Sequence, residues 1–184
     1  MTDRPLRADA RRNRDRVLAA AQEAFATEGI SVPLDEIARR AGVGAGTVYR
    51  HFPTKEALFE AAMLDRVERM TAIARAGAET DDPGGAFFDY LAQMAADGGV
   101  KRDLADAIGP RRAQDFLAQT FEMKSAIGEL LTAAQRAGAV RTDIGIDDLM
   151  AILKGLFLAI HDGGADPGIH ARAFAVMVDG LRTR

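Results

Sequence analysis

The sequence contains no cysteine. Disulfide bonds, thiolate zinc sites and cysteine nucleophiles are therefore excluded. It also lacks any apolar run near the roughly 18 residues that a membrane span requires. The first 16 residues carry six arginines with no apolar run behind them, unlike a secretory leader. We therefore expect no membrane segment and a cytoplasmic location.

Side chains suited to catalysis are scarce. The chain has only two serines, Ser31 and Ser125, and neither lies in a nucleophile-elbow context. Four C-terminal side chains resemble a metal cluster, but they straddle a Gly-Gly turn and a proline, which is typical of exposed loop residues. They are His161, Asp162, Asp166 and His170. We expect no enzymatic activity, no metal and no cofactor.

Strand-like alternation is also missing, since no period-two run of strand length appears. Apolar residues recur at helical spacing instead, which predicts an all-α fold. Four helices are expected in the first 76 residues, followed by a break over 77–85 that is rich in Gly, Pro and Asp. Further helices are expected over 86–97, 101–108, 111–137, 146–161 and 168–182.

The first four helices are closely spaced, and the second and third are short. Gly29 should end the first, Pro33 should begin the second and Gly42 should end it, and Thr54 should cap the fourth. The expected buried faces are Val17, Leu18, Ala21, Ala24 and Phe25 in the first helix, Leu34, Ile37, Ala38 and Ala41 in the second, and Ala57, Ala61, Leu64 and Val67 in the fourth.

Charge is unevenly distributed along the chain. The net charge is −3, but residues 1–55 carry 10 Lys and Arg against 7 Asp and Glu. The N-terminal third is therefore basic and the remainder acidic, a pattern that suits a nucleic-acid partner for the first part. An arginine-rich terminus on an ordinary acidic protein would give the same balance.

The second and third helices are separated by a three-residue turn, Gly42-Val43-Gly44. This spacing is typical of a helix-turn-helix, in which the second helix enters the DNA major groove, although ordinary helical proteins also contain it. Hydrogen-bond donors and small residues occupy the third helix, 45–52, and cations flank it. The candidate DNA contacts are Arg14, Ala45, Gly46, Thr47, Tyr49, Arg50, His51 and Lys55.

Residues 12–63 resemble the DNA-binding domain of the TetR family of repressors. The likeness is strongest in DEIARRAGV (35–43), GTVYRHF (46–52) and KEAL (55–58). It implies a recognition helix in which Thr47, Tyr49 and His51 face DNA, with Tyr49 and Lys55 largely on phosphates. The chain departs from the common pattern at Pro33, where many members have a serine or threonine cap, and at Gly44-Ala45, where many have a polar pair. The operator should then be read with fewer direct contacts and more through its shape.

The helical pattern and its break over 77–85 predict a domain layout, and the resemblance implies a mode of action. The expected parts are a flexible arm (1–10), a helix-turn-helix domain (11–56), a connecting helix (57–76) and a regulatory and dimerisation domain (77–184). The protein would bind a palindromic operator as a homodimer, act as a repressor and be released by a small molecule. A constitutive DNA binder without an effector is the alternative, and a helical enzyme is a distant one.

Two apolar stripes near the C-terminus suit a dimer interface, because the last two helices of TetR proteins pair across a two-fold axis. Burial within one chain would explain the stripes equally well. The candidate interface residues are Leu149, Leu153, Leu156, Phe157, Ile160, Ala173, Val176, Met177 and Leu181.

Large, adaptable apolar side chains gather in the middle of the chain. Such residues line ligand pockets, but they more often form ordinary core, and the family resemblance favours a pocket. The candidate effector-binding residues are Phe87, Tyr90, Met94, Phe116 and Phe121.

Overall fold

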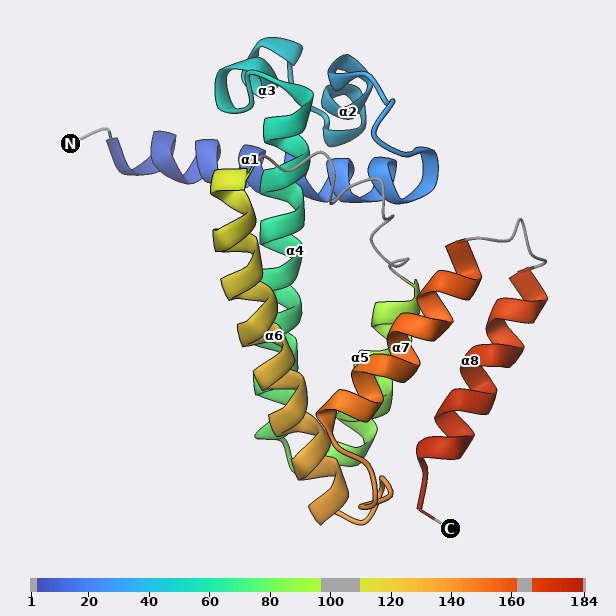
Figure 1. The fold of residues 1–184 in the computed structure, drawn as a ribbon. Helices are drawn as coiled ribbons and strands as arrows, with labels where there is room; N and C mark the ends of the chain where they lie inside the picture. The colour runs from blue at the N-terminus through green and yellow to red at the C-terminus, as the bar shows by residue number, and fades with distance from the viewer. Residues whose placement is uncertain (1–2, 97–109, 162–166, 184) are drawn as a thin grey trace. The chain divides into compact units, whose positions relative to one another are not determined.

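The computed structural model describes residues 3–96, 110–161 and 167–183, and the helix expected over 101–108 lies outside them. Within these ranges the regular elements are all α-helices, which confirms the all-α fold (Figure 1). One isolated antiparallel bridge joins Val140 and Arg182. The helices are α1 (Asp3–Glu28), α2 (Leu34–Ala41), α3 (Ala45–His51), α4 (Lys55–Ala78), α5 (Pro83–Ala96), α6 (Pro110–Arg136), α7 (Ile146–His161) and α8 (Pro167–Leu181).

The chain divides into two compact units. The first holds α1, α2, α3, the part of α4 up to Val67 and the start of α6 up to Phe116. The second holds α4 from Glu68, α5, α6 from Leu117, α7 and α8. Among the described segments, no helix combines the length and apolarity that crossing a bilayer requires.

The core of the first unit follows the predicted faces of α1 and α2. All five predicted residues of α1 and all four of α2 are buried. The rings of Phe25 and Phe59 meet edge to face with their centroids 5.2 Å apart. Gln22 ties α1 to α4 by donating to the carbonyl of Ala62 at 2.8 Å and to the carboxylate of Asp65 at 3.0 Å. Short helices, which are marginal alone, are stabilised here by packing.

The buried face of α4 differs from the expected one. Thr54 caps the helix as predicted, since its hydroxyl accepts from the backbone N–H of Ala57 at 3.1 Å. However, Ala57, Ala61 and Leu64 are only half-buried. The core instead takes the neighbouring face, which carries larger side chains and therefore removes more apolar area from water. That face consists of Leu58, Phe59, Ala62 and Met63, with Val67 buried as predicted.

The predicted break after α4 is shorter than expected. Helix α4 continues to Ala78 and α5 already begins at Pro83. Asp82 accounts for the difference, because its carboxylate accepts from the backbone N–H of Gly85 at 2.8 Å and caps α5. The Pro-Gly-Gly sequence that suggested a loop is therefore the first turn of a helix.

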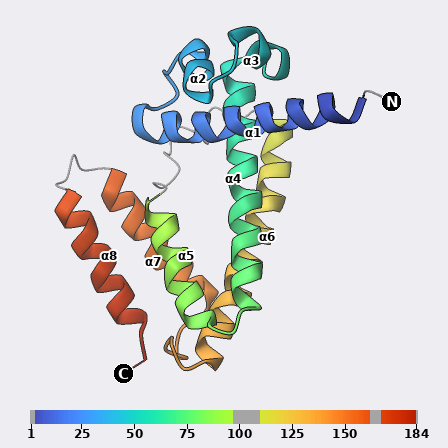
Figure 2. The same cartoon turned by 180° about the vertical axis from the view of Figure 1, so that it is seen from behind.

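The second unit has its own core. Helices α7 and α8 run alongside each other in both views (Figure 1, Figure 2). The central residues of this core come from the part of α4 that belongs to the unit and from α5 to α8. They include Met70, Ala74, Phe87, Tyr90, Leu91, Ile127, Leu130, Leu149, Leu153 and Leu181.

Candidate nucleic-acid interface

One face of helix α3 packs against the core of the first unit, and the opposite face is exposed. Val48 is buried in the first unit's core, and Phe52, the residue that ends the helix, is buried one turn later. The opposite side exposes Gly46, Tyr49 and Arg50, which are three and four residues apart and therefore share a face. Tyr49 is 48% exposed, which is high for an aromatic side chain without a partner surface. This face is free to meet a large ligand.

The remaining predicted contacts differ in exposure and come from three helices, α1, α3 and α4. His51 is exposed, whereas Ala45 and Thr47 are half-buried. Arg14 is exposed on α1. Lys55 is half-buried, and its ammonium donates to the carbonyl of Ser31 at 3.0 Å, so it braces the loop before α2.

Gly42 fixes the direction in which the chain enters α3. Its backbone is left-handed, with φ +64° and ψ +37°, a conformation that strains any residue with a Cβ. Its N–H donates to the carbonyl of Arg39 at 3.1 Å, and the N–H of Val43 donates to the carbonyl of Ala38 at 3.0 Å. These bonds form a Schellman ending, so the turn geometry is set locally by the glycine predicted to stop α2.

Arg16 is a further residue of the interface that the sequence did not indicate. Its guanidinium donates to the carbonyl of Gly42 at 2.9 Å and so ties α1 to the turn. The two residues are 26 positions apart. A contact between residues so far apart cannot be predicted from a local sequence pattern. The sequence showed only that the segment containing Arg16 is basic.

A charged network organises the exposed side of α2. The carboxylate of Glu36 accepts from Arg39 at 2.7 and 2.8 Å and from Arg40 at 2.8 Å. Arg40 also donates to Glu28 at 2.5 Å. Hydrogen bonds from Arg39 and then Arg40 lower the pKa of Glu36 from 4.5 to about 2. The same network raises the pKa of Arg40, chiefly through its hydrogen bond with Glu28.

We expect Glu36→Gln to lower thermal stability at neutral pH. The depressed pKa means that Glu36 stabilises the fold above about pH 4.5 and that this contribution is lost as pH falls through about 2. The melting temperatures of parent and variant, recorded from pH 7 to pH 2, should therefore converge in acid. Glu23→Gln, at an exposed carboxylate of α1, is the matched control. A difference between parent and Glu36→Gln that stays constant across this range would contradict the assignment.

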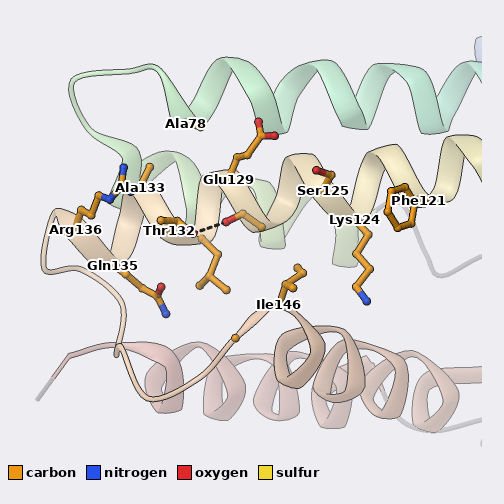
Figure 3. Close-up of a pocket in the computed structure, with 13 residues that line it drawn as sticks. Ala78, Phe121, Lys124, Ser125, Glu129, Thr132, Ala133, Gln135, Arg136 and Ile146 are labelled. Carbon is orange, nitrogen blue, oxygen red and sulfur yellow. Dashed lines mark hydrogen bonds between the residues drawn. The ribbon is translucent and has the colours of Figure 1, made fainter.

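Three of the predicted effector-binding residues lie in or against one core cluster of the second unit. Phe87 and Tyr90 are buried in the second unit's core and Met94 is half-buried. Phe121 is 74% exposed, and the side chain of Phe116 lies outside the described part of the structure. Phe121 instead borders a separate, open hollow of about 710 Å³ along α6, which also involves Lys124, Thr132 and Ile146 (Figure 3).

The predicted dimer residues fall into three groups. Leu149, Leu153 and Leu181 belong to the core of their own chain. Leu156, Phe157 and Met177 are half-buried, whereas Ala173 and Val176 are exposed. The side chain of Ile160 lies outside the described residues.

Other apolar side chains are exposed on the same two helices. Ile152 and Leu158 are 42% and 36% exposed on α7, and Ile169 is 50% exposed on α8. The sequence could not separate these from the core residues, because α7 is apolar on nearly all sides.

The described residues contain no group of three or more His, Asp or Glu side chains arranged to hold a metal ion. Of the four side chains that the sequence analysis assigned to an exposed loop, Asp162, Asp166 and the side chain of His161 lie outside the described part.

The whole chain is similar to solved TetR regulators. A TetR transcription regulatory protein from Mycobacterium vanbaalenii is 43% identical, with a TM-score of 0.71, and the match covers 97% of this chain and 100% of that one. A TetR transcriptional regulator from Streptomyces coelicolor is 34% identical, with a TM-score of 0.75 and coverage of 92% and 98%.

A curated relative matches only the N-terminal part. The HTH-type transcriptional regulator SrpR of Pseudomonas putida is 43% identical over 60 residues, which are 32% of this chain and 28% of that regulator. The aligned segment thus spans less than a third of that relative's length.

Two family models cover most of the sequence. Residues 17–62 match the model of bacterial regulatory proteins of the tetR family, and residues 82–183 match that of the SbtR-like transcriptional regulator C-terminal domain. The first match contains α2, α3 and the exposed face that carries Tyr49. The members of the TetR family are transcriptional regulators and not enzymes. The chain therefore belongs to the TetR family and is a DNA-binding transcriptional regulator.

Proposed function

We propose that the protein is a repressor that binds a palindromic operator as a homodimer and is released by a small molecule. The observation that carries DNA binding is the exposed face of α3, held in place from behind by Val48 and Phe52. A helix that reads DNA must combine a fixed position with free polar side chains, and α3 has both.

The proposed DNA contacts form two groups, one to base edges and one to phosphates. Thr47 and His51 would read base edges, while Tyr49 and Lys55 would bind phosphates, with Arg14 and Arg50 beside them. The bond from Lys55 to Ser31 does not oppose this role, because an ammonium has three donors and only one is used there. Lys55 would then hold the loop and a phosphate together.

The proposed dimer interface consists of the outward faces of α7 and α8. Each helix exposes small or apolar residues at helical spacing, and such faces in a folded chain are typical of a surface that meets a partner. These residues are Ala151, Ile152, Gly155 and Leu158 on α7, and Ile169, Ala173, Val176 and Gly180 on α8. Two copies of this face would form a four-helix bundle around a two-fold axis.

Operator selection tests the DNA-binding proposal directly. Duplexes that bind the protein would be enriched from a random library and sequenced. A two-fold symmetric dimer predicts two inverted half-sites whose centres lie about 10–10.5 base pairs apart or at a multiple of that spacing. Enrichment of a single, unpaired half-site would contradict the palindromic operator.

The effector is proposed to act through the second unit, on the residues around Phe87, Tyr90 and Met94. A transcriptional regulator from Saccharomonospora viridis with this fold, 18% identical, is known in complex with choline. That ligand belongs to that protein, but it makes a small-molecule site worth testing here. Helix α4 contributes residues to both units and is the proposed link between effector and DNA.

We expect effector and operator to weaken each other by the same factor. A metabolite found by screening for operator release should lower operator affinity by about 5- to 150-fold, and saturating operator should lower the metabolite's affinity equally, because coupling between two sites is reciprocal. Calorimetric titration of the metabolite with and without operator measures this.

A constitutive DNA binder is the second candidate. It is favoured by the burial of Phe87 and Tyr90, which are 0% and 1% exposed in the described chain. Equal metabolite affinity with and without operator would make this the better account.

A further inference from the structure

Two glycines at the start of α3, Gly44 and Gly46, are not required by the backbone conformation or by the packing of the described chain. Gly44 precedes α3 with φ −68° and ψ +142°, a conformation open to any residue. Gly46 lies inside α3 and is not among the described glycines with positive φ. A Cβ added to either would meet no atom within 4 Å in the described part of the chain.

Several other glycines of the chain do have such reasons, whereas Gly155 and Gly180, which lie on the proposed dimer face, also have open space around an added Cβ. Gly42 is required by its positive φ, and a Cβ on Gly84 would come within 2.5 Å of the Cβ of Ala139. Glycine inside a helix lowers its stability relative to alanine, because more backbone freedom is lost on folding. Gly46 therefore weakens a seven-residue helix, and nothing in the described chain requires it.

The position of Gly46 indicates that the DNA partner, and not the fold, requires a glycine there. It is exposed on the same face as Tyr49 and Arg50, the face proposed to meet DNA. We infer that Gly46 sets the distance between the recognition helix and the operator, because a side chain there would hold the helix backbone away from the bases. This inference rests on the proposed DNA-binding role of α3.

The experiment is a size series at Gly46, measured on the operator selected for the parent protein. Gly46→Ala should raise the melting temperature by about 1–3 °C, since the helix gains propensity. It should also lower operator affinity at least tenfold, and Gly46→Leu should lower it further. Affinity for unrelated DNA, which depends mainly on phosphate contacts, should change less than threefold.

A control separates the steric effect from a general effect of replacing a helical glycine. Gly128→Ala on α6 adds a Cβ that meets Ile146 at 3.7 Å, an ordinary contact, and should leave operator affinity unchanged. If the parent protein does not bind the selected operator, the proposed function is wrong. If the parent binds it, the ratio of the variant's operator affinity to the parent's tests the role of Gly46. Unchanged operator affinity in Gly46→Ala, a lower melting temperature, or an equal loss on unrelated DNA would each overturn the inference.

Discussion

Val176→Asp is expected to split the dimer and to lower operator affinity at least a hundredfold. Val176 is 72% exposed in the single chain, in the middle of the proposed face of α8. An aspartate there would bury an unpaired carboxylate in an apolar interface, at a cost of about 3–5 kcal/mol. A monomer reads only one half-site, so the operator complex should fail with the dimer.

Sedimentation at micromolar concentration measures the first effect and operator titration measures the second. Val176→Leu keeps the position apolar and should remain dimeric. Phe121→Asp places the same charge at another exposed side chain, outside the proposed face, and should also remain dimeric. If the parent itself sediments as a monomer, the proposed interface is wrong.

Leu153 would be a poor site for this test, although the sequence pattern favoured it. Leu153 is 2% exposed in the core of its own chain. A charge there would unfold the protomer and would therefore say nothing about the interface. The interface is therefore tested at Val176, an exposed position on the same pair of helices.

Removing side chains from α3 and from the start of α4 should produce the second large effect. Tyr49→Ala and Lys55→Ala are expected to weaken binding to all DNA sequences. Lys55→Ala should also reduce the slope of the salt dependence by about one, because it removes a cation that neutralises a phosphate, whereas Tyr49→Ala removes no charge and should leave the slope unchanged. Thr47→Ala and His51→Ala should lower operator affinity by about 1–3 kcal/mol and also change which bases are preferred.

Titrations at several salt concentrations, with selection repeated for each variant, measure these effects. Lys124→Ala, which removes a cation of the second unit that pairs with Asp147, is the matched control for Lys55→Ala. Operator binding like that of the parent in all four variants, three of them in α3 and Lys55→Ala at the start of α4, would show that α3 does not read DNA.

The sequence predicted those features that depend on neighbouring residues. The buried faces of α1 and α2, the stop at Gly42 and the cap at Thr54 each follow from spacing or backbone preference within one turn. The face of α4 was wrong by about one position, because the apolar pattern there offers two adjacent faces.

Features formed by distant residues were not predictable in the same way. The bonds from Arg16 to Gly42 and from Lys55 to Ser31 join residues more than 20 positions apart. Likewise, only the packed chain shows that Leu153 faces inward and Ile152 outward on α7. A helix that is apolar all round does not indicate which side meets its own core.

The stoichiometry of the operator complex tests the central claim most directly. Sedimentation of the protein with a selected duplex should give two chains per duplex, and scrambling one half-site should lower affinity at least a hundredfold, because both recognition helices must bind together. One chain per duplex, with affinity unchanged after one half-site is scrambled, would contradict the account of a dimeric regulator on a palindromic operator.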